Sequence, residues 1–520
     1  MSSRTITIDP VTRIEGHQKI EAKVEDGVVR EAKSSGALFR GFELILRRRD
    51  PRDAQRITQR VCGVCPASHA VASALNLDSA FGIADRVPDN GRIIRNLILG
   101  SNYLQSHILH FFHLAALDYV DVTALSDYEG EDPEMRSVRE FLSRGALEPF
   151  VPRYEGDYRF PKETDRKLVG DYIKALEMRR LAHEMAAIFG GKMPHNASIV
   201  PGGATENPSV DKMAGFLWRL NRIRDFIDTV YIPDVLALAE AYPDYFEIGA
   251  GPRNFLSYGA FDLDGSEPDY ARRERFYVQG ALEGMRDLKE LDTSQIAESV
   301  RHSWYEGEGP LHPSHGRTEP SPGKEGGYSW IKAPRYEGEV YEVGPLARVL
   351  VSYVAGREPV RKLLDEILGK LGLGLGKMNS VLGRHIARAL DAKLVADAMA
   401  DWVLQLRPGE PVCVPYELPE EAEGMGITEA PRGALGHWIR IERGRIAHYQ
   451  LVVPTTWNAS PRDEWERPGP MEQALEGTKI RDLENPYELG RIVRSFDPCL
   501  ACSVHILDAR GRRHGKVRVP

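Results

Sequence analysis

Apolar and polar residues alternate at both ends of the chain and follow a helical period through most of the middle. Residues 4–40 alternate around the turn Glu25-Asp26-Gly27, which predicts a hairpin or small sheet. Residues 409–460 alternate as well and predict strands. From Asp89 to Val120, apolar residues recur every three or four positions, which predicts a helix of roughly 45 Å. Further helical periods cover 165–189, 208–231 and 345–406, the last interrupted at Gly369–Gly376.

Two pairs of cysteines, each separated by two residues, lie near opposite ends of the chain. The first pair is Cys62 and Cys65, and the second is Cys499 and Cys502. Two thiols at this spacing can bind one soft metal ion. Pro66 stands where a helix would begin, so the first pair is predicted at a helix N-terminus, where partial positive charge favours thiolate. We expect both pairs to bind one metal centre inside the fold.

Composition places the chain among soluble globular proteins. Its 520 residues are 42% hydrophobic and 28% charged, and the length allows about three domains or one large unit. The formal net charge of −8 argues against nucleic acid or an anionic membrane as the main partner. No run approaches the roughly 18 apolar residues of a membrane span, and no export signal is predicted. Residues 305–342, rich in proline and glycine, predict surface loops.

The residues alone leave three interpretations of the cysteines open. Five cysteines in so long a chain argue against a secreted disulfide scaffold. Structural zinc is the usual use of two such pairs, but Cys65 and Cys499 are 434 residues apart, and zinc ribbons close much shorter loops. A functional thiolate site and no metal at all are the other two possibilities. Cys413, which stands alone, is predicted to be a small buried apolar residue.

Three histidines on the predicted 89–120 helix are not predicted to bind metal. His107, His110 and His113 are three residues apart, so they spread over about 120° of the helix surface and cannot all face one ion. They are expected to be core or interface residues.

Both cysteine pairs belong to longer motifs that resemble a known family. Cys62 and Cys65 lie in a segment that runs from Arg60 to His69, and the second pair lies in Asp497-Pro-Cys-Leu-Ala-Cys-Ser-Val-His505. These resemble the paired motifs of the large subunit of nickel–iron hydrogenases of the respiratory uptake type. Further segments resemble the same family, in the family's order: Arg13-Ile-Glu15-Gly-His17, Arg40-Gly-Phe-Glu43, Gly190-Gly-Lys-Met-Pro-His195, Pro201-Gly-Gly203, Glu429-Ala-Pro431-Arg432-Gly-Ala-Leu-Gly-His437-Trp438 and Val453-Pro-Thr-Thr-Trp-Asn458.

The resemblance implies two metal sites. Cys62, Cys65, Cys499 and Cys502 would bind nickel. Of these, Cys65 and Cys502 would also bridge to an iron that carries cyanide and carbon monoxide. A magnesium ion would be held by the residues Glu43, Leu451 (through its backbone carbonyl) and His505. Such a centre splits H2 heterolytically.

The resemblance also implies roles for residues around the metals. Cys499 would accept the proton and pass it to Glu15. Arg432 would lie over the open coordination side and Thr455 would donate to a cyanide. His69 would orient a bridging sulfur, with Pro431 and Asp497 also near the centre. Without the resemblance, Glu15 would be expected to be a solvated or salt-bridged hairpin residue, Arg432 a surface arginine, Thr455 a strand residue and Glu43 an exposed helix carboxylate.

The implied fold is mainly α, a long-helix bundle with small peripheral β elements. Residues 1–505 would form the large subunit, with an N-terminal β element at 1–40, a helical body at 41–406, and a β-containing segment at 407–505 that carries the second pair. Residues 506–520 look like the peptide that the family's maturation protease removes after nickel-insertion proteins load the metal. We expect cleavage between His505 and Ile506.

The implied partner is an iron–sulfur small subunit in an obligate heterodimer, through which electrons pass to a quinone or cytochrome. The expected location is the periplasmic face of a membrane, reached by export together with that subunit. Gln105-Ser106-His107 departs from the acidic residue of many membrane-bound members, so a cytoplasmic, cofactor-coupled hydrogenase is the alternative. A structural-zinc scaffold protein and a quinone-reductase subunit of related fold are the alternatives from other classes, although the latter proteins lack both cysteine pairs.

Overall fold

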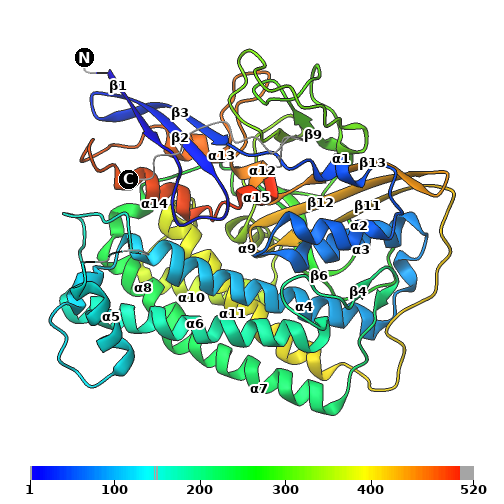
Figure 1. Cartoon of the computed structure of the whole chain (residues 1–520), viewed down its shortest axis with the longest axis horizontal. Helices are drawn as coiled ribbons and strands as arrows, with labels where there is room; N and C mark the ends of the chain where they lie inside the picture. Colours follow the sequence, from blue (N-terminus) through cyan, green and yellow to red (C-terminus); the bar gives the residue numbers. More distant parts are fainter. Residues whose placement is uncertain (1–2, 146, 148–149, 504–520) are drawn as a thin grey trace.

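The structure, a computed structural model, describes residues 3–145, 147 and 150–503, without the side chains of residues 502 and 503. Within these ranges, helices occupy one half of the molecule in Figure 1 and most of the strands lie in the other. No helix in this part of the chain combines the length and the apolar character needed to cross a bilayer.

Four long helices pack side by side and form the helical half of the molecule (Figure 1). They are α4 (Asp89–Ile108), α6 (Lys162–Gly190), α7 (Val210–Phe226) and α11 (Val381–Leu404). The period predicted from Asp89 continues beyond α4 as a π-helical segment, Leu109–Ala115. Further helices complete this half: α5 (Pro133–Ser143), α8 (Ile232–Ala241), α9 (Pro345–Val354) and α10 (Glu358–Leu371).

The predicted interruption near Gly369 is confirmed. Helix α10 ends at Leu371, and its C-cap residue, Gly372, adopts the left-handed conformation with φ 65° that glycine accepts without steric cost. A second interruption, at residues 355–357, separates α9 from α10. The region predicted as helical from 345 to 406 therefore contains three α-helices and a short 3-10 helix, Leu375–Met378.

Both regions of alternating residues form antiparallel sheets, as predicted. The first contains β1 (Ser3–Ile8), β2 (Gln18–Glu25) and β3 (Val28–Gly36) in that order. The second contains β11 (Glu421–Ala430), β12 (Gly433–Glu442) and β13 (Arg445–Val452).

A third sheet lies inside the region expected to be a helical body. It contains β6 (Phe255–Asp262), β7 (Arg275–Glu283) and β8 (Asp287–Lys289). Every residue of β6 is buried, and β6 contacts α9 and β11. The expectation that β elements are peripheral was therefore wrong for this strand. Because β6 is covered on both faces, it lacks the alternation that reveals a half-exposed strand.

The prediction of surface loops at 305–342 was wrong for the last third of that region. Residues 329–336 are buried, and β10 (Ala333–Tyr336) pairs with β9 (Ile296–Ser299). The Trp330 ring stacks on Phe39 at a centroid distance of 5.0 Å. Glycine and proline mark turns, but the apolar residues among them fill the core here.

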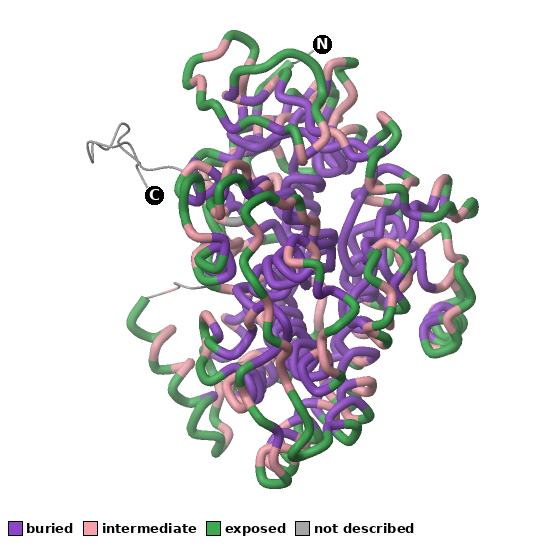
Figure 2. Tube along the Cα trace, turned by 90° about the vertical axis from the view of Figure 1, so that its right-hand side faces the viewer, coloured by how far each residue is buried: buried purple, intermediate pink, exposed green. Residues whose placement is uncertain are grey.

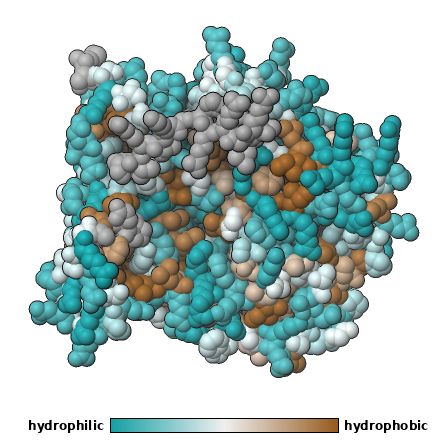
Figure 3. All heavy atoms as spheres, viewed as in Figure 1, coloured by the Kyte–Doolittle hydropathy of each residue, from teal (hydrophilic) through white to brown (hydrophobic). Residues whose placement is uncertain are grey.

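Helix α3 (Pro66–Ala80) lies directly on β11 because that strand carries two glycines at the contact. A Cβ atom at Gly424 or Gly426 would collide with the backbone of α3. The helix is buried almost throughout, and Figure 2 shows such buried chain running through the middle of the molecule. The face in Figure 3 is mainly hydrophilic, with separate apolar patches. The start of α3, with the first cysteine pair, is thus fixed in the interior.

Candidate metal centre

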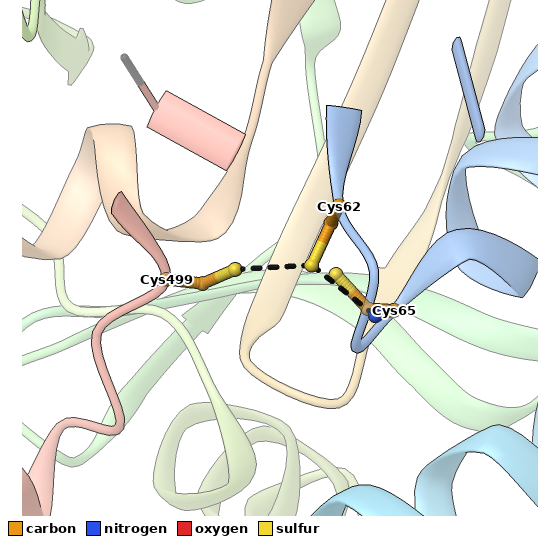
Figure 4. Close-up of side chains that lie close together, drawn as sticks. All are labelled: Cys62, Cys65 and Cys499. Atoms are coloured by element: carbon orange, nitrogen blue, oxygen red, sulfur yellow. Dashed lines mark hydrogen bonds between the residues drawn. The ribbon is translucent and has the colours of Figure 1, made fainter. Parts of the chain in front are cut away.

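Three of the four paired cysteines meet in the interior of the molecule. The sulfur atoms of Cys62, Cys65 and Cys499 all lie within 4.8 Å of one another (Figure 4). The Cys62 and Cys499 sulfurs are 3.3 Å apart, and each of the three residues is at most 2% exposed. The prediction that the two ends of the chain meet is confirmed. The Cys502 side chain lies outside the described atoms.

The first pair is positioned by the start of α3. Cys65 is the N-cap of that helix, and Pro66 is its first residue, as predicted. The backbone N–H groups of Val64 and Cys65 donate to Sγ of Cys62 over 3.2 and 3.3 Å. Backbone donors and the positive end of the helix therefore both favour negative charge on these sulfurs.

The second pair is held by the N-terminal segment between β1 and β2. Glu15 and Cys499 form a parallel bridge, in which the Leu500 N–H donates to the Glu15 carbonyl over 2.7 Å. The Cys499 N–H donates to Oγ1 of Thr455 over 2.9 Å. A backbone contact from Glu15 and a side-chain contact from Thr455, two distant parts of the chain, thus fix the position of Cys499.

Glu15 points at Cys499. Its Oε2 atom accepts from the Cys499 thiol and from the Ala501 N–H, both over 3.0 Å. Burial raises the pKa of Glu15, and negative charge at Cys62 adds to this, whereas the two hydrogen bonds and Arg432 oppose it. A solvated hairpin residue is therefore the wrong interpretation of Glu15.

Arg432 is 2% exposed, so it is not a surface arginine. Its Nε and Nη2 donate to the carbonyl and to Oδ1 of Asp497 over 2.8 and 2.9 Å. Its Nη1 donates to Oγ of Ser106 over 3.3 Å. Burial alone would lower the pKa of the guanidinium, but Asp497 and the cysteine sulfurs keep it above its usual value. A permanent positive charge therefore lies beside the sulfurs.

Three further predicted residues surround this cluster. Thr455 accepts from Cys499 through its oxygen, so its hydroxyl proton is available for another acceptor. Burial lowers the pKa of His69 to about 4, and its Nδ1 lies 3.2 Å from Nε2 of His437. The Pro431 carbonyl accepts from Nη2 of Arg348 over 2.6 Å. The predicted bonds to a cyanide and to a bridging sulfur stay predictions.

Glu43 and Leu451, predicted to hold magnesium, lie together in the interior. The Leu451 N–H donates to Oε1 of Glu43 over 3.0 Å, and the Thr318 hydroxyl donates to Oε2. Glu43 is buried, so an exposed helix carboxylate is the wrong interpretation. His505 lies outside the described residues. The carboxylate of Glu43 is the type of oxygen ligand that magnesium prefers.

The chemistry of these residues fits a nickel–iron centre beside a hard cation. Clustered buried thiolates suit a soft or borderline metal ion. Cys502 would bring the number of thiolate ligands to four. A model of the nickel-dependent hydrogenase family matches residues 40–505, and one described as HoxL-like matches residues 5–35. The chain belongs to the nickel-dependent hydrogenases.

Individual relatives agree with this assignment. The periplasmic [NiFeSe] hydrogenase large subunit of Desulfomicrobium baculatum is 45% identical, over 98% of this chain and 96% of its own length. The uptake hydrogenase large subunit of Rhizobium leguminosarum bv. viciae is 36% identical, over 100% of this chain and 98% of its own length. A solved structure of the Dm. baculatum [NiFeSe]-hydrogenase superposes with a TM-score of 0.85 at 45% identity, covering 97% of this chain and 100% of that one.

The chain is therefore a hydrogenase large subunit, an oxidoreductase that acts on H2 with nickel and iron as cofactors. A bound magnesium ion is consistent with this family.

In this hydrogenase the three histidines of the 89–120 region are buried and contact different partners, as predicted: Asp391, Arg494 and Tyr172. Cys413 is only half-buried, so the prediction of a buried residue held in part.

Sequence reasoning missed several polar residues around the cysteines of the hydrogenase. Ser106 contacts Arg432, and Arg348 contacts the carbonyls of Ala430 and Pro431. One signal in the sequence could have indicated them: they are polar residues on the buried face of a predicted helix, and a buried polar residue needs a hydrogen-bond partner. Their partners are distant in sequence, so the pattern could not identify them.

Proposed function

We propose that this hydrogenase oxidises H2 and passes the electrons to a quinone or cytochrome. The name of the Rhizobium relative, an uptake enzyme, supports this direction. A cytoplasmic, cofactor-coupled hydrogenase remains the second candidate, supported by the segment Gln105-Ser106-His107, which departs from the acidic residue of many membrane-bound members near this position.

The proposal depends on one observation, that thiols from both ends of the chain lie within 4.8 Å of one another. We assign nickel to Cys62, Cys65, Cys499 and Cys502, with Cys65 and Cys502 shared with iron. Magnesium is assigned to Glu43, the Leu451 carbonyl and His505.

The bound centre supplies the site at which H2 is split. The chain's own residues then receive the proton. Sγ of Cys499 holds it first and passes it to Oε2 of Glu15, which lies within hydrogen-bond distance at 3.0 Å. The raised pKa of Glu15 favours its acceptance of a proton.

The surrounding residues place charge and buried polar groups beside this path. Arg432 places a fixed positive charge beside the sulfurs, held by both the carbonyl and the carboxylate of Asp497. Thr455 and His69 are assigned to a cyanide and a bridging sulfur, and Pro431 fixes the segment before Arg432. Burial of these groups excludes bulk water, which strengthens each electrostatic contact.

The electrons from H2 must leave this chain through a partner protein. Outside the two cysteine pairs only Cys413 remains, and one thiol cannot hold an iron–sulfur cluster. We therefore propose an obligate iron–sulfur small subunit, export with it to the periplasmic face of the membrane, and association with that membrane through partners. The periplasmic name of the Desulfomicrobium relative supports this location.

Maturation by nickel-insertion proteins and a protease is part of the proposal. The family match ends at residue 505, which supports removal of residues 506–520. These residues lie outside the described part of the chain, so the support comes from sequence. A mass measurement of the active protein should give a chain that ends at His505, and active protein that retains Pro520 would contradict the cleavage.

Metal analysis of the purified complex tests the proposed function. We expect nickel and iron bound to the chain, together with H2 oxidation measured by reduction of a redox dye. Cys499→Ser should lose nickel and activity, whereas Cys413→Ser, outside the cluster, should retain both. Zinc in place of nickel, with no H2 oxidation, would support the scaffold protein instead.

A further inference from the structure

Two side chains of α4 donate to the same backbone carbonyl, that of Val64 between the cysteines of the first pair. Nδ2 of Asn102 and Nε2 of Gln105 lie 2.8 and 2.7 Å from this oxygen. Both side chains are buried, at 0% and 1% exposure. The two amides, three residues apart on one face of the helix, thus converge on one peptide group.

The opposite end of that peptide group donates to a sulfur. The N–H paired with the Val64 carbonyl belongs to Cys65, and it donates to Sγ of Cys62 over 3.3 Å. In a trans peptide the C=O and N–H bonds point in opposite directions. Donors on the oxygen therefore polarise the group and strengthen the N–H as a donor to sulfur.

Helix α6 fixes the orientation of Gln105. Nε of Arg179 and Nε2 of His183 lie 3.4 and 3.2 Å from Oε1 of Gln105. Because a guanidinium can only donate, the oxygen of Gln105 must face α6. The amide nitrogen therefore faces Val64, in the orientation that donates to the carbonyl.

We propose that Asn102, Gln105 and the Val64–Cys65 peptide form an amide relay that withdraws negative charge from the Cys62 sulfur. This rests on the proposed function, in which Cys62 binds nickel. Hydrogen bonds to a coordinating sulfur stabilise the more reduced state of a metal centre, so the relay raises the reduction potential of the nickel. Asn102 and Gln105 are positioning residues that act through the peptide group.

A redox titration of the purified holoenzyme, followed by electron paramagnetic resonance of the nickel, tests the relay. Gln105→Met and Asn102→Leu remove one donor each at similar side-chain size. We expect each variant to retain nickel and to shift the midpoint potential to more negative values. The double variant should shift it further than either single change.

Asn96→Leu is the matched control. Asn96 also lies on α4, is buried, and donates through Nδ2 to a backbone carbonyl over 2.9 Å, but that carbonyl belongs to Asp262. It should lose comparable stability and leave the midpoint potential unchanged. If Gln105→Met fails to retain nickel, Asn102→Leu carries the test, because it removes the other donor to the Val64 carbonyl without adding charge.

Three results would overturn the relay. One is an unchanged midpoint potential in nickel-loaded Gln105 and Asn102 variants. Another is an equal shift in Asn96→Leu. A parent protein that carries no nickel would overturn the proposed function and the relay together, which distinguishes the two failures.

Discussion

The thiol of Cys499 donates a hydrogen bond of 3.0 Å to Oε2 of Glu15, a residue 484 positions earlier in the chain. The backbones of the same two residues form a bridge, so this contact does not depend on a flexible side chain alone. A proton on the sulfur therefore has an acceptor at a fixed distance.

Glu15→Gln removes that acceptor at constant size. General-base groups contribute about 10²–10⁴-fold to rate, so we expect H2 oxidation to fall by this order. Nickel content should remain, because Glu15 is not assigned to a metal. Glu21→Gln, on β2 and half-exposed, is the control that should retain activity. Full activity in Glu15→Gln would exclude Glu15 as the proton acceptor.

Gly16→Ala should displace the second cysteine pair. Gly16 has φ +83°, and a Cβ atom there would lie 2.6 Å from the Ala501 nitrogen and 2.8 Å from Cβ of Leu500. We expect lower nickel content and proportionally lower activity, measured by metal analysis. Gly27→Ala separates the two causes, because Gly27 has a similar φ of +76° but its Cβ would meet only one atom, at 3.9 Å. Equal nickel loss in both variants would contradict the steric explanation.

Arg348→Met should destabilise the fold strongly. Arg348 is fully buried between Asp391 and Glu429, with contacts of 2.6 and 2.8 Å. Removing it leaves two buried carboxylates without their cation, which costs about 3–5 kcal/mol. Urea denaturation measures the change. Breaking the exposed pair of Arg222 with Glu177 by Arg222→Met should cost less than about 1 kcal/mol.

A similar loss of stability in both arginine variants would show that the buried ion pairs add little to the fold. Both variants replace arginine by methionine, and they differ in whether the carboxylate partners of the arginine are buried or exposed.

Glu472 should make stability fall as pH rises. Burial raises its pKa to about 7, although donors from Ser34, Tyr328 and Gly469 oppose this. The folded state therefore holds a proton that the unfolded state releases above about pH 4.5, so stability is lost between about pH 4.5 and 7. The loss is of the order of 3 kcal/mol.

Glu472→Gln removes this proton from both states. We expect its free energy of unfolding to fall less than that of the parent between pH 5 and pH 8, as measured by urea denaturation at both values. Glu423→Gln, exposed on β11, should follow the parent. The same pH dependence of the free energy of unfolding in Glu472→Gln and in the parent would contradict the prediction.

The cysteine pairs and the start of α3 could be predicted because local signals mark them. Cysteine spacing and a proline at the first helical position act over a few residues, whatever the rest of the fold does. The meeting of the two pairs was predicted from the cysteines themselves, but spacing alone left structural zinc open, so the choice of nickel and iron needed the family resemblance.

Burial of charged residues could not be predicted in the same way. Glu43 is buried because Thr318 and the Leu451 N–H satisfy its two oxygens, and both lie more than 270 positions away. Strand β6 was missed for the converse reason, because burial on both faces removes the alternation of a strand. Both depend on which distant segments pack together.

The distance along the chain between the two cysteine pairs also sets an order in time. At about 5–20 residues per second, ribosomes finish Cys499 roughly 20–90 s after Cys65, 434 residues earlier. During that interval a nascent chain presents two thiols that zinc could capture. The four-thiol nickel site that we propose is therefore complete only when translation has nearly finished.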